Sequence, residues 1–328
     1  MAPGCRLQLT RVRSLLMSNT AALKAAFRGA DASVCVFGAD VRLSVLRCSQ
    51  TVADAARRWA WSASDEPATA RRWGAHAAHA LLYSTFLSGE ERVIARCGGA
   101  YVEVIAVGEV RGFVGGAGAG ALSVADALHV EKVIYNSAVP HVSSVPSVGD
   151  AHVDWQRFYS SSEQVQTFSA VEVNAAVGSG GAEEQVLAPP PFVGGLIVQA
   201  LPPSEGADGA RGAEGVARVR ELWENGELPP LESIAGTREG PADFLRHVAG
   251  AAALAIPSDA AAAARRRVGF YCRCTTAGFA ERLGALETET LVEMRDEGGC
   301  ALTCEMCNEP HHVSADALDA LITAQVTA

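Results

Sequence analysis

The 328-residue chain lacks an uninterrupted apolar run of the roughly 18 to 20 residues that a membrane-spanning helix needs. Its most alanine-rich stretch, residues 249–264, is interrupted by Pro257, Ser258 and Asp259. The chain also has little positive charge: 27 Lys and Arg face 37 Asp and Glu, which gives a net charge of −10. Because the chain lacks a long apolar run, we do not expect a membrane as a partner. Because phosphate binding needs clustered Lys and Arg, we do not expect nucleic acid as a partner either.

Several enzyme signatures are missing as well. The sequence contains no Gly-x-Ser-x-Gly motif, so it lacks the nucleophile elbow of an α/β-hydrolase. The glycine-rich run 116–121 follows a predicted antiparallel meander rather than a βαβ unit, which argues against a dinucleotide-binding loop. His76 and His79 share a predicted helix, but no third ligand follows at helical distance. We therefore expect these histidines to pack or to be solvated, and not to bind a metal.

The composition favours a folded chain, because 49% of the residues are hydrophobic and only 20% are charged. The length exceeds one typical domain of about 100 to 200 residues. We predict an α+β protein in which a mixed α/β core with an antiparallel sheet precedes a helical linker and a small C-terminal zinc-binding module. The expected boundaries are an N-terminal extension over 1–40, a core over 41–203, a metastable linker region with an alanine-rich insertion over 204–267, and the module over 268–328.

Hydrophobic periodicity places the elements of the core. Alternation predicts a strand over 41–45, and helical spacing predicts helices over 51–61 and 68–87, of which the second is apolar on every side and therefore buried. Further strands are expected over 92–96, 101–107, 109–114, 130–135, 142–148, 166–175 and 192–200, with a helix over 150–159. The linker shows two short helical patterns, over 216–224 and 241–249.

The first 30 residues carry basic side chains but no acidic residue before Asp31, which is typical of a mitochondrial transit peptide. Part of this bias follows from the arginine-rich composition of the whole chain. Nine cysteines without a secretory leader indicate a reducing compartment. We expect a cytoplasmic protein with a disordered N-terminal extension, and mitochondrial targeting is the alternative.

Four of the nine cysteines form two close pairs. One residue separates Cys272 from Cys274, and after 29 further residues two residues separate Cys304 from Cys307. Zinc prefers four tetrahedral ligands, and chelating pairs at such spacings can supply neighbouring corners. The sequence therefore predicts one Zn²⁺ per chain, bound by these four thiolates. With four cysteine ligands no position is left for a water molecule, so metal-activated hydrolysis is not expected.

The module around these cysteines has only a thin apolar core and contains ten acidic residues against three arginines. A core of this size supplies a few kcal/mol, whereas structural zinc supplies about 10 to 16 kcal/mol of apparent binding free energy. The metal is therefore expected to decide whether the module folds. Cys300, His311 and His312 lie near the second pair, and we expect them to be packing or solvated residues rather than substitute ligands.

Three further stretches accompany the cysteine pairs: FYSSSEQ at 158–164, GGLIVQALP at 194–202, and Arg111-Gly112 in a predicted strand. In this order and spacing they resemble the redox-regulated holdase chaperones of the heat-shock protein thirty-three family, over residues 41–322. The first 40 residues, the long alanine-rich stretch and Pro310 to His312 depart from the family pattern. For Gly194, Gly195 and Gln199 we expect close packing of a strand rather than a functional role.

The resemblance implies an ATP-independent chaperone for unfolding client proteins, and not an enzyme. It implies that the reduced, zinc-bound form is inactive. Oxidation would form the disulfides Cys272–Cys274 and Cys304–Cys307, release zinc, unfold the module and linker, and expose apolar surface in a protein that is a homodimer when oxidised. Two alternatives stay open: a thiol-disulfide oxidoreductase that uses Cys304 and Cys307, and a zinc-dependent interaction module without a redox response.

Overall fold

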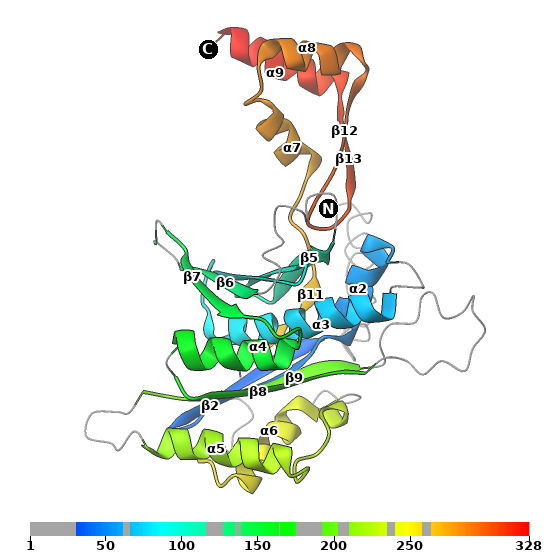
Figure 1. Ribbon diagram of the computed structural model, residues 1–328. Coiled ribbons are helices and arrows are strands. Elements are labelled where there is room, and N and C mark those ends of the chain that lie inside the picture. Colours follow the sequence, from blue (N-terminus) through cyan, green and yellow to red (C-terminus); the bar gives the residue numbers. More distant parts are fainter. Residues whose placement is uncertain are drawn as a thin grey trace, which may run out of the picture.

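The computed structural model describes residues 31–61, 66–115, 127–134, 137, 139–163, 165–174, 192–202, 210–234, 240–257 and 264–327. Within these ranges the core has four layers, in which two β-sheets alternate with two layers of helices (Figure 1). A small C-terminal module projects from the outer face of one sheet (Figure 1). This arrangement confirms the predicted α+β class.

The first sheet contains five antiparallel strands in the order β10-β1-β2-β9-β8. Their bounds are β1 Ala32–Phe37, β2 Val41–Arg47, β8 Thr167–Asn174, β9 Phe192–Ala200 and β10 Ala264–Arg267. The second sheet has the order β11-β5-β4-β3-β6-β7, and only its β11–β5 pair is parallel. Its bounds are β3 Arg92–Cys97, β4 Ala100–Ile105, β5 Glu109–Val114, β6 Ala127–Val133, β7 His141–Pro146 and β11 Gly269–Phe270.

The layer between the sheets consists of α2 (Ser49–Trp59), α3 (Glu66–Tyr83) and α4 (Ala151–Phe158). Helix α3 contacts both sheets, as its all-round apolar pattern predicts. A single π-helical turn, Tyr159–Glu163, continues α4. The largest fully buried side chains of this layer are aromatic: Trp73, Tyr83, Trp155, Phe158 and Tyr159.

The linker helices cover the outer face of the first sheet. Helix α5 (Ala210–Glu224) and α6 (Gly240–Ala251) are joined through a 3₁₀ turn, Leu231–Ile234. Their apolar residues pack against those of the sheet in one buried cluster that includes Val219, Leu222, Leu43 and Leu196. Both helices are longer than their sequence patterns predict.

Strand β1 is not predicted from the sequence, which places the start of the core at residue 41. It pairs with β2 along its whole length, from Ala32 opposite Arg47 to Phe37 opposite Arg42. Just before it, the buried carboxylate of Asp31 accepts hydrogen bonds from the backbone nitrogen and the hydroxyl of Thr51, at 2.6 and 2.7 Å. We therefore propose that the core unit begins near Asp31.

Residues 264–270, here called the crossing segment, connect the two sheets. Their first part forms β10 at the edge of the first sheet, and their last part forms β11 at the edge of the second. Within β10 the guanidinium of Arg266 donates hydrogen bonds to the carbonyl oxygens of Leu81 at 2.9 Å and Ala106 at 2.7 Å. The end of the linker region is thereby fastened to the core before the chain enters the module.

The module consists of three helices and one hairpin: α7 Thr276–Leu283, α8 Thr288–Asp296, β12 Gly299–Thr303, β13 Pro310–Ser314 and α9 Ala315–Thr327. Its fully buried apolar residues are few, namely Leu291, Val313 and Leu318. Among the helices of the described residues, none has the length and apolar character required to cross a membrane.

The strand around Gly194 and Gly195 is closely packed, as expected. A Cβ atom on Gly194 would lie 2.6 Å from the carbonyl oxygen of Leu46, and one on Gly195 would lie 2.8 Å from that of Ala170. The buried Gln199 accepts a hydrogen bond from Arg42. His76 and His79 are likewise buried packing residues. The glycine run 116–121 lies outside the described residues.

Candidate metal centre

The first cysteine pair lies in the short loop between β11 and α7. Cys272 and Cys274 are both half-buried. Directly after them, the hydroxyl of Thr275 accepts a hydrogen bond from the backbone nitrogen of Gly278 at 3.0 Å. This N-cap fixes the start of α7, because it satisfies one of the free N–H groups at the helix end. The loop is thus held at both ends, by β11 and by α7.

The second pair lies in the turn between β12 and β13. The backbone nitrogen of Cys304 donates to the oxygen of Glu309 at 2.9 Å, and the nitrogen of Asn308 donates to the oxygen of Cys304 at 2.8 Å. Asn308 adopts a left-handed conformation, with φ of 58°, which asparagine tolerates better than most residues. The turn directs Cys304 and Cys307 inward, where both are buried.

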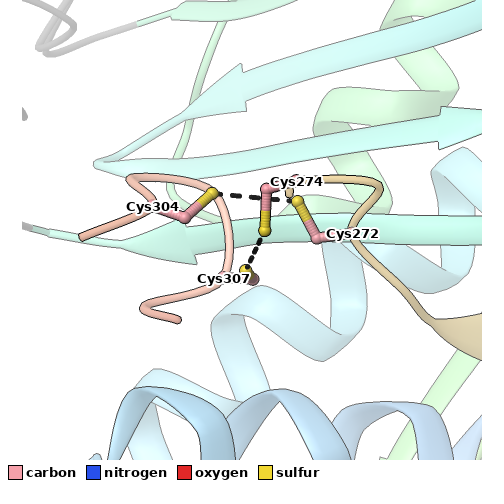
Figure 2. A group of neighbouring side chains, drawn as sticks. All are labelled: Cys272, Cys274, Cys304 and Cys307. Atoms are coloured by element: carbon pink, nitrogen blue, oxygen red, sulfur yellow. Dashed lines mark hydrogen bonds between the residues drawn. The ribbon is translucent and has the colours of Figure 1, made fainter. Parts of the chain in front are cut away.

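The four sulfur atoms converge on one point (Figure 2). All lie within 4.8 Å of one another, with 3.8 Å between Cys272 and Cys304 and 3.5 Å between Cys274 and Cys307. These separations exceed the S–S bond of about 2.05 Å in a disulfide. They are close to the edge of about 3.8 Å in a tetrahedron whose Zn–S bonds measure about 2.3 Å. The donor set therefore fits a tetrahedral metal ion.

The thiols differ in how readily they ionise. Burial raises the pKa of Cys274 to about 11 and raises the pKa of Cys307 as well. Burial also opposes ionisation of Cys272, but hydrogen bonds from the backbone of Cys274 and from Arg111 outweigh it, so the pKa of Cys272 is lowered. Four thiolates this close repel one another, and a bound dication would favour the fully deprotonated set. The cluster can therefore bind a metal.

The second sheet touches the centre through Arg111 of β5. Its guanidinium donates a hydrogen bond to the sulfur of Cys272 at 3.5 Å and forms an ion pair with Glu103 of β4 at 2.8 Å. Glu103 is almost fully buried, so its carboxylate holds the arginine firmly in place. The sequence indicates Arg111 only as part of a motif. The alternation of residues in a strand does not predict that this side chain contacts a module far away in the sequence.

The turn that carries the second pair rests on the same sheet. The backbone nitrogen of Gly112 donates to the oxygen of Met306 at 3.2 Å. The Met306 side chain packs against a small cluster on that face, which comprises Trp59, Ile94, Tyr101 and Phe113. At the end of α2, Arg58 pairs with Glu309. The turn that holds Cys304 and Cys307 is thus in direct contact with the core.

Of the three residues near the second pair, His311 alone touches the cluster. Its Nε2 lies 3.3 Å from the sulfur of Cys274, and its Nδ1 lies 3.2 Å from the hydroxyl of Thr276. Cys300 lies outside the four-sulfur group, and its sulfur lies 4.0 Å from the oxygen of Ala301. His312 is exposed. None of the three belongs to the set of converging ligand atoms.

Comparison with known proteins gives a consistent result. The model of the Hsp33 protein family matches residues 33–314. The 33 kDa chaperonin of Geobacillus kaustophilus is 25% identical over 311 residues, which cover 87% of this chain and 94% of that protein. The 33 kDa chaperonin of Streptococcus suis is 28% identical over 189 residues, which cover 57% of this chain and 56% of that protein.

A solved structure shows the same fold. The crystal structure of the 33 kDa chaperonin (Hsp33) from Thermotoga maritima superposes with a TM-score of 0.67 and 21% sequence identity, and the match covers 91% of this chain and 99% of that one. Because the family model spans most of the residues, including all four cysteines of the cluster, this chain belongs to the Hsp33 family of chaperones, which bind client proteins and are not enzymes.

Proposed function

We propose that this chain is an ATP-independent holdase that is switched on by oxidation of the four-cysteine cluster. The observation that carries the proposal is the convergence of four sulfur atoms within 4.8 Å in a module with little apolar core. In the reduced form Cys272, Cys274, Cys304 and Cys307 hold one Zn²⁺. The metal keeps the sulfurs deprotonated and supplies most of the free energy that folds the module.

Oxidation removes the ligands. Cys272 pairs with Cys274, and Cys304 pairs with Cys307. For each disulfide, two thiolates lose two electrons to one molecule of hydrogen peroxide, which takes up two protons and leaves as two molecules of water. A disulfide sulfur is a poor zinc ligand, so the ion is released. Without it the small cluster around Leu291, Val313 and Leu318 cannot keep the module folded.

Loss of the module loosens the linker, and this exposes the client-binding surface. Helices α5 and α6 cover a sheet face whose residues include Leu43 and Leu196. Once these helices detach, both they and the sheet present contiguous apolar surface, which binds unfolding clients. We further propose a homodimer in the oxidised state and a cytoplasmic location. Residues 1–30, which carry the alternative mitochondrial signal, lie outside the described residues.

A peroxide titration of the reduced protein at raised temperature tests this proposal. Zinc release, helix content and protection of a heat-labile client are followed on one sample, and we expect the three to change together. Cys300→Ser is the matched control, because this cysteine lies outside the cluster, and it should respond like the wild type. Cys304→Ser should uncouple zinc release from client protection.

The same titration separates the competing functions. If oxidised, zinc-free protein protects the client no better than reduced protein, the switch is refuted. A thiol-disulfide oxidoreductase using Cys304 and Cys307 would instead turn over disulfide substrates at catalytic protein concentration, whereas a holdase acts near stoichiometrically. A redox-insensitive interaction module would keep its zinc in the presence of peroxide.

A further inference from the structure

A cavity of about 660 Å³ lies between the second sheet and the module. Two cysteines of the cluster, Cys274 and Cys304, contribute to its wall, and of these Cys274 is only half-buried, whereas Cys304 is buried. Tyr101 from the sheet and Phe279 from the module supply apolar surface. Cavities of about 300 to 1,000 Å³ accommodate small-molecule ligands, and a molecule of tripeptide size fits this one.

The cavity concentrates positive charge in an acidic protein. Four arginines line it, two from the sheet and two from the module: Arg92, Arg111, Arg273 and Arg282. The module has only three arginines in all, against ten acidic residues, and two of the three lie here. In a chain of net charge −10, a local group of guanidinium side chains raises the local concentration of anions.

The carboxylates that line the cavity do not neutralise all four of its arginines. Glu103 is buried and pairs with Arg92 at 3.4 Å and Arg111 at 2.8 Å, so one negative charge is shared by two arginines. Arg273 forms an ion pair with Glu109 of β5 at 2.7 Å, so its charge is already matched, and the other lining carboxylate, Glu281, is exposed. Arg282 is also exposed, and among the described residues the ion pairs of the cavity arginines involve Arg92, Arg111 and Arg273 but not Arg282. Guanidinium groups can pair with the carboxylates of a ligand through two parallel hydrogen bonds.

We propose that this cavity binds one tripeptide half of a small anionic disulfide such as oxidised glutathione and presents the S–S bond of that ligand to Cys274. The inference rests on the proposed redox switch, because it supplies a second class of oxidant to the same cluster. The arginines hold the carboxylates of the ligand and stabilise the thiolate that leaves.

The reaction consists of two thiol–disulfide exchanges. The thiolate of Cys274 attacks one sulfur of the ligand, the S–S bond of the ligand breaks, and one ligand thiolate departs. Cys272, whose sulfur lies within 4.8 Å, then attacks the sulfur of Cys274 and displaces the second ligand thiolate. Two cysteine thiolates lose two electrons and form Cys272–Cys274, while the ligand disulfide is reduced to two thiolates. No proton is consumed.

The first test compares two disulfides of opposite charge on the reduced, zinc-loaded full chain. Zinc release is timed with a chromogenic chelator, using oxidised glutathione as the anionic reagent and cystamine as the cationic one. In the double variant Arg92→Gln/Arg282→Gln, the ratio of the anionic rate to the cationic rate should fall at least fivefold. The control Arg71→Gln/Arg157→Gln, which changes two exposed arginines of α3 and α4, should keep the wild-type ratio.

The second test measures binding without chemistry. S-methylglutathione keeps the two carboxylates of one half of the ligand but has no disulfide, and its binding is followed by calorimetry. We expect at least a tenfold weaker affinity in the double variant, at unchanged zinc content and melting temperature. An equal affinity, or an unchanged rate ratio, overturns the cavity assignment.

A peroxide control separates this inference from the proposed function. Hydrogen peroxide is small and neutral, so it should release zinc from the wild type and the double variant at equal rates. If peroxide works and the rate ratio does not change, the cavity assignment alone fails. If peroxide releases no zinc from either protein, the redox switch itself fails.

Discussion

Gly112 stands where the second sheet meets the metal centre. Its φ of +147° lies in the region that L side chains rarely adopt, and a Cβ atom would overlap the carbonyl oxygen of Tyr101 on the neighbouring strand. The same residue uses its N–H for Met306 and its carbonyl for the indole of Trp59, which donates at 2.7 Å. Arg111 therefore extends its guanidinium toward Cys272, and the adjacent Gly112 allows the backbones of β4 and β5 to approach closely.

Gly112→Ala should destabilise the reduced, zinc-loaded protein by at least about 2 kcal/mol, because the added methyl group forces β4 and β5 apart. Urea denaturation measures this difference. Gly115→Ala is the matched control, since Gly115 also has a positive φ, +59°, but a Cβ atom there would meet no other atom of the described residues within 4 Å. Its cost should stay near 1 kcal/mol. Equal losses in the two variants would contradict this account of Gly112.

At the scale of elements, helices α3 and α4 meet through buried histidines. His79 stacks on Trp155 with ring centroids 5.6 Å apart, and its Nε2 has no hydrogen-bond partner among the described residues. His76 accepts a hydrogen bond from the Trp155 indole at 3.3 Å. Burial lowers the pKa of His76 to about 4 and lowers the pKa of His79 well below its usual value. Both rings are therefore neutral in the folded core.

This contact should make the core sensitive to acid. An unfolded histidine titrates near pH 6.5. Below that pH, His76 and His79 bind protons in the unfolded chain but stay neutral in the folded chain. The contribution of these two histidines to the free energy of unfolding is fully present above about pH 7 and decreases as the pH drops through 6.5 toward 4. At pH 5 the loss should be about 2 kcal/mol for each of the two histidines.

The pH dependence of urea unfolding checks this expectation. His76→Gln/His79→Gln should flatten the slope between pH 7 and 5, because glutamine does not titrate, even where it lowers stability at both pH values. The control His247→Gln changes an exposed histidine of α6 and should leave the slope as it is. A slope that the double variant shares with the wild type would show that other groups cause the acid sensitivity.

Helix α5 offers a test of the linker. Leu222 is 2% exposed and packs in the cluster under the helix, so Leu222→Ala should weaken the docking of α5 by about 2 to 4 kcal/mol. If linker release uncovers the client-binding surface, the reduced, zinc-loaded variant should already suppress aggregation of a heat-labile client. Arg218→Ala, an exposed change on the same helix, should not. A variant with a detached linker and no protection would contradict this role.

Most elements follow from the periodicity of the sequence, and those that do not have physical reasons. Strand β1 is buried on both faces over most of its length, so it shows little alternation. The sequence of β10, ARRR, has the composition of a solvated surface, and only pairing with β1 makes it a strand. Helix α5 begins earlier than predicted because Gly212 permits a close approach: a Cβ atom on it would lie 2.5 Å from the carbonyl oxygen of Asp40.

The metal centre likewise has one part that the sequence predicts and one part that it does not. Spacing alone predicts which four cysteines converge, because two chelating pairs are visible in the sequence. It does not predict that Arg111 and Met306 join the cluster to the core, since those contacts depend on how the module sits on the second sheet. Contacts between units far apart in the sequence have no local signature.

For the whole molecule, removal of the metal should unfold one part and spare the other. The two core clusters are large, whereas that of the module is small. Chelation of zinc from reduced protein should therefore abolish amide protection over residues 272–314 and preserve it in β2 and β9. Hydrogen exchange read by mass spectrometry measures both regions at once. Protection that persists in the metal-free module would refute the dependence of its fold on zinc.

The crossing segment fixes where the module starts, whatever precedes it. Helix α6 is anchored on the first sheet and β10 on its edge, so the chain between Pro257 and Ala264 joins two fixed points. The entropy of closing such a connection grows only slowly with its length. Extra residues, or a fluorescent reporter, inserted in this connection should therefore leave the positions of the cysteines unchanged.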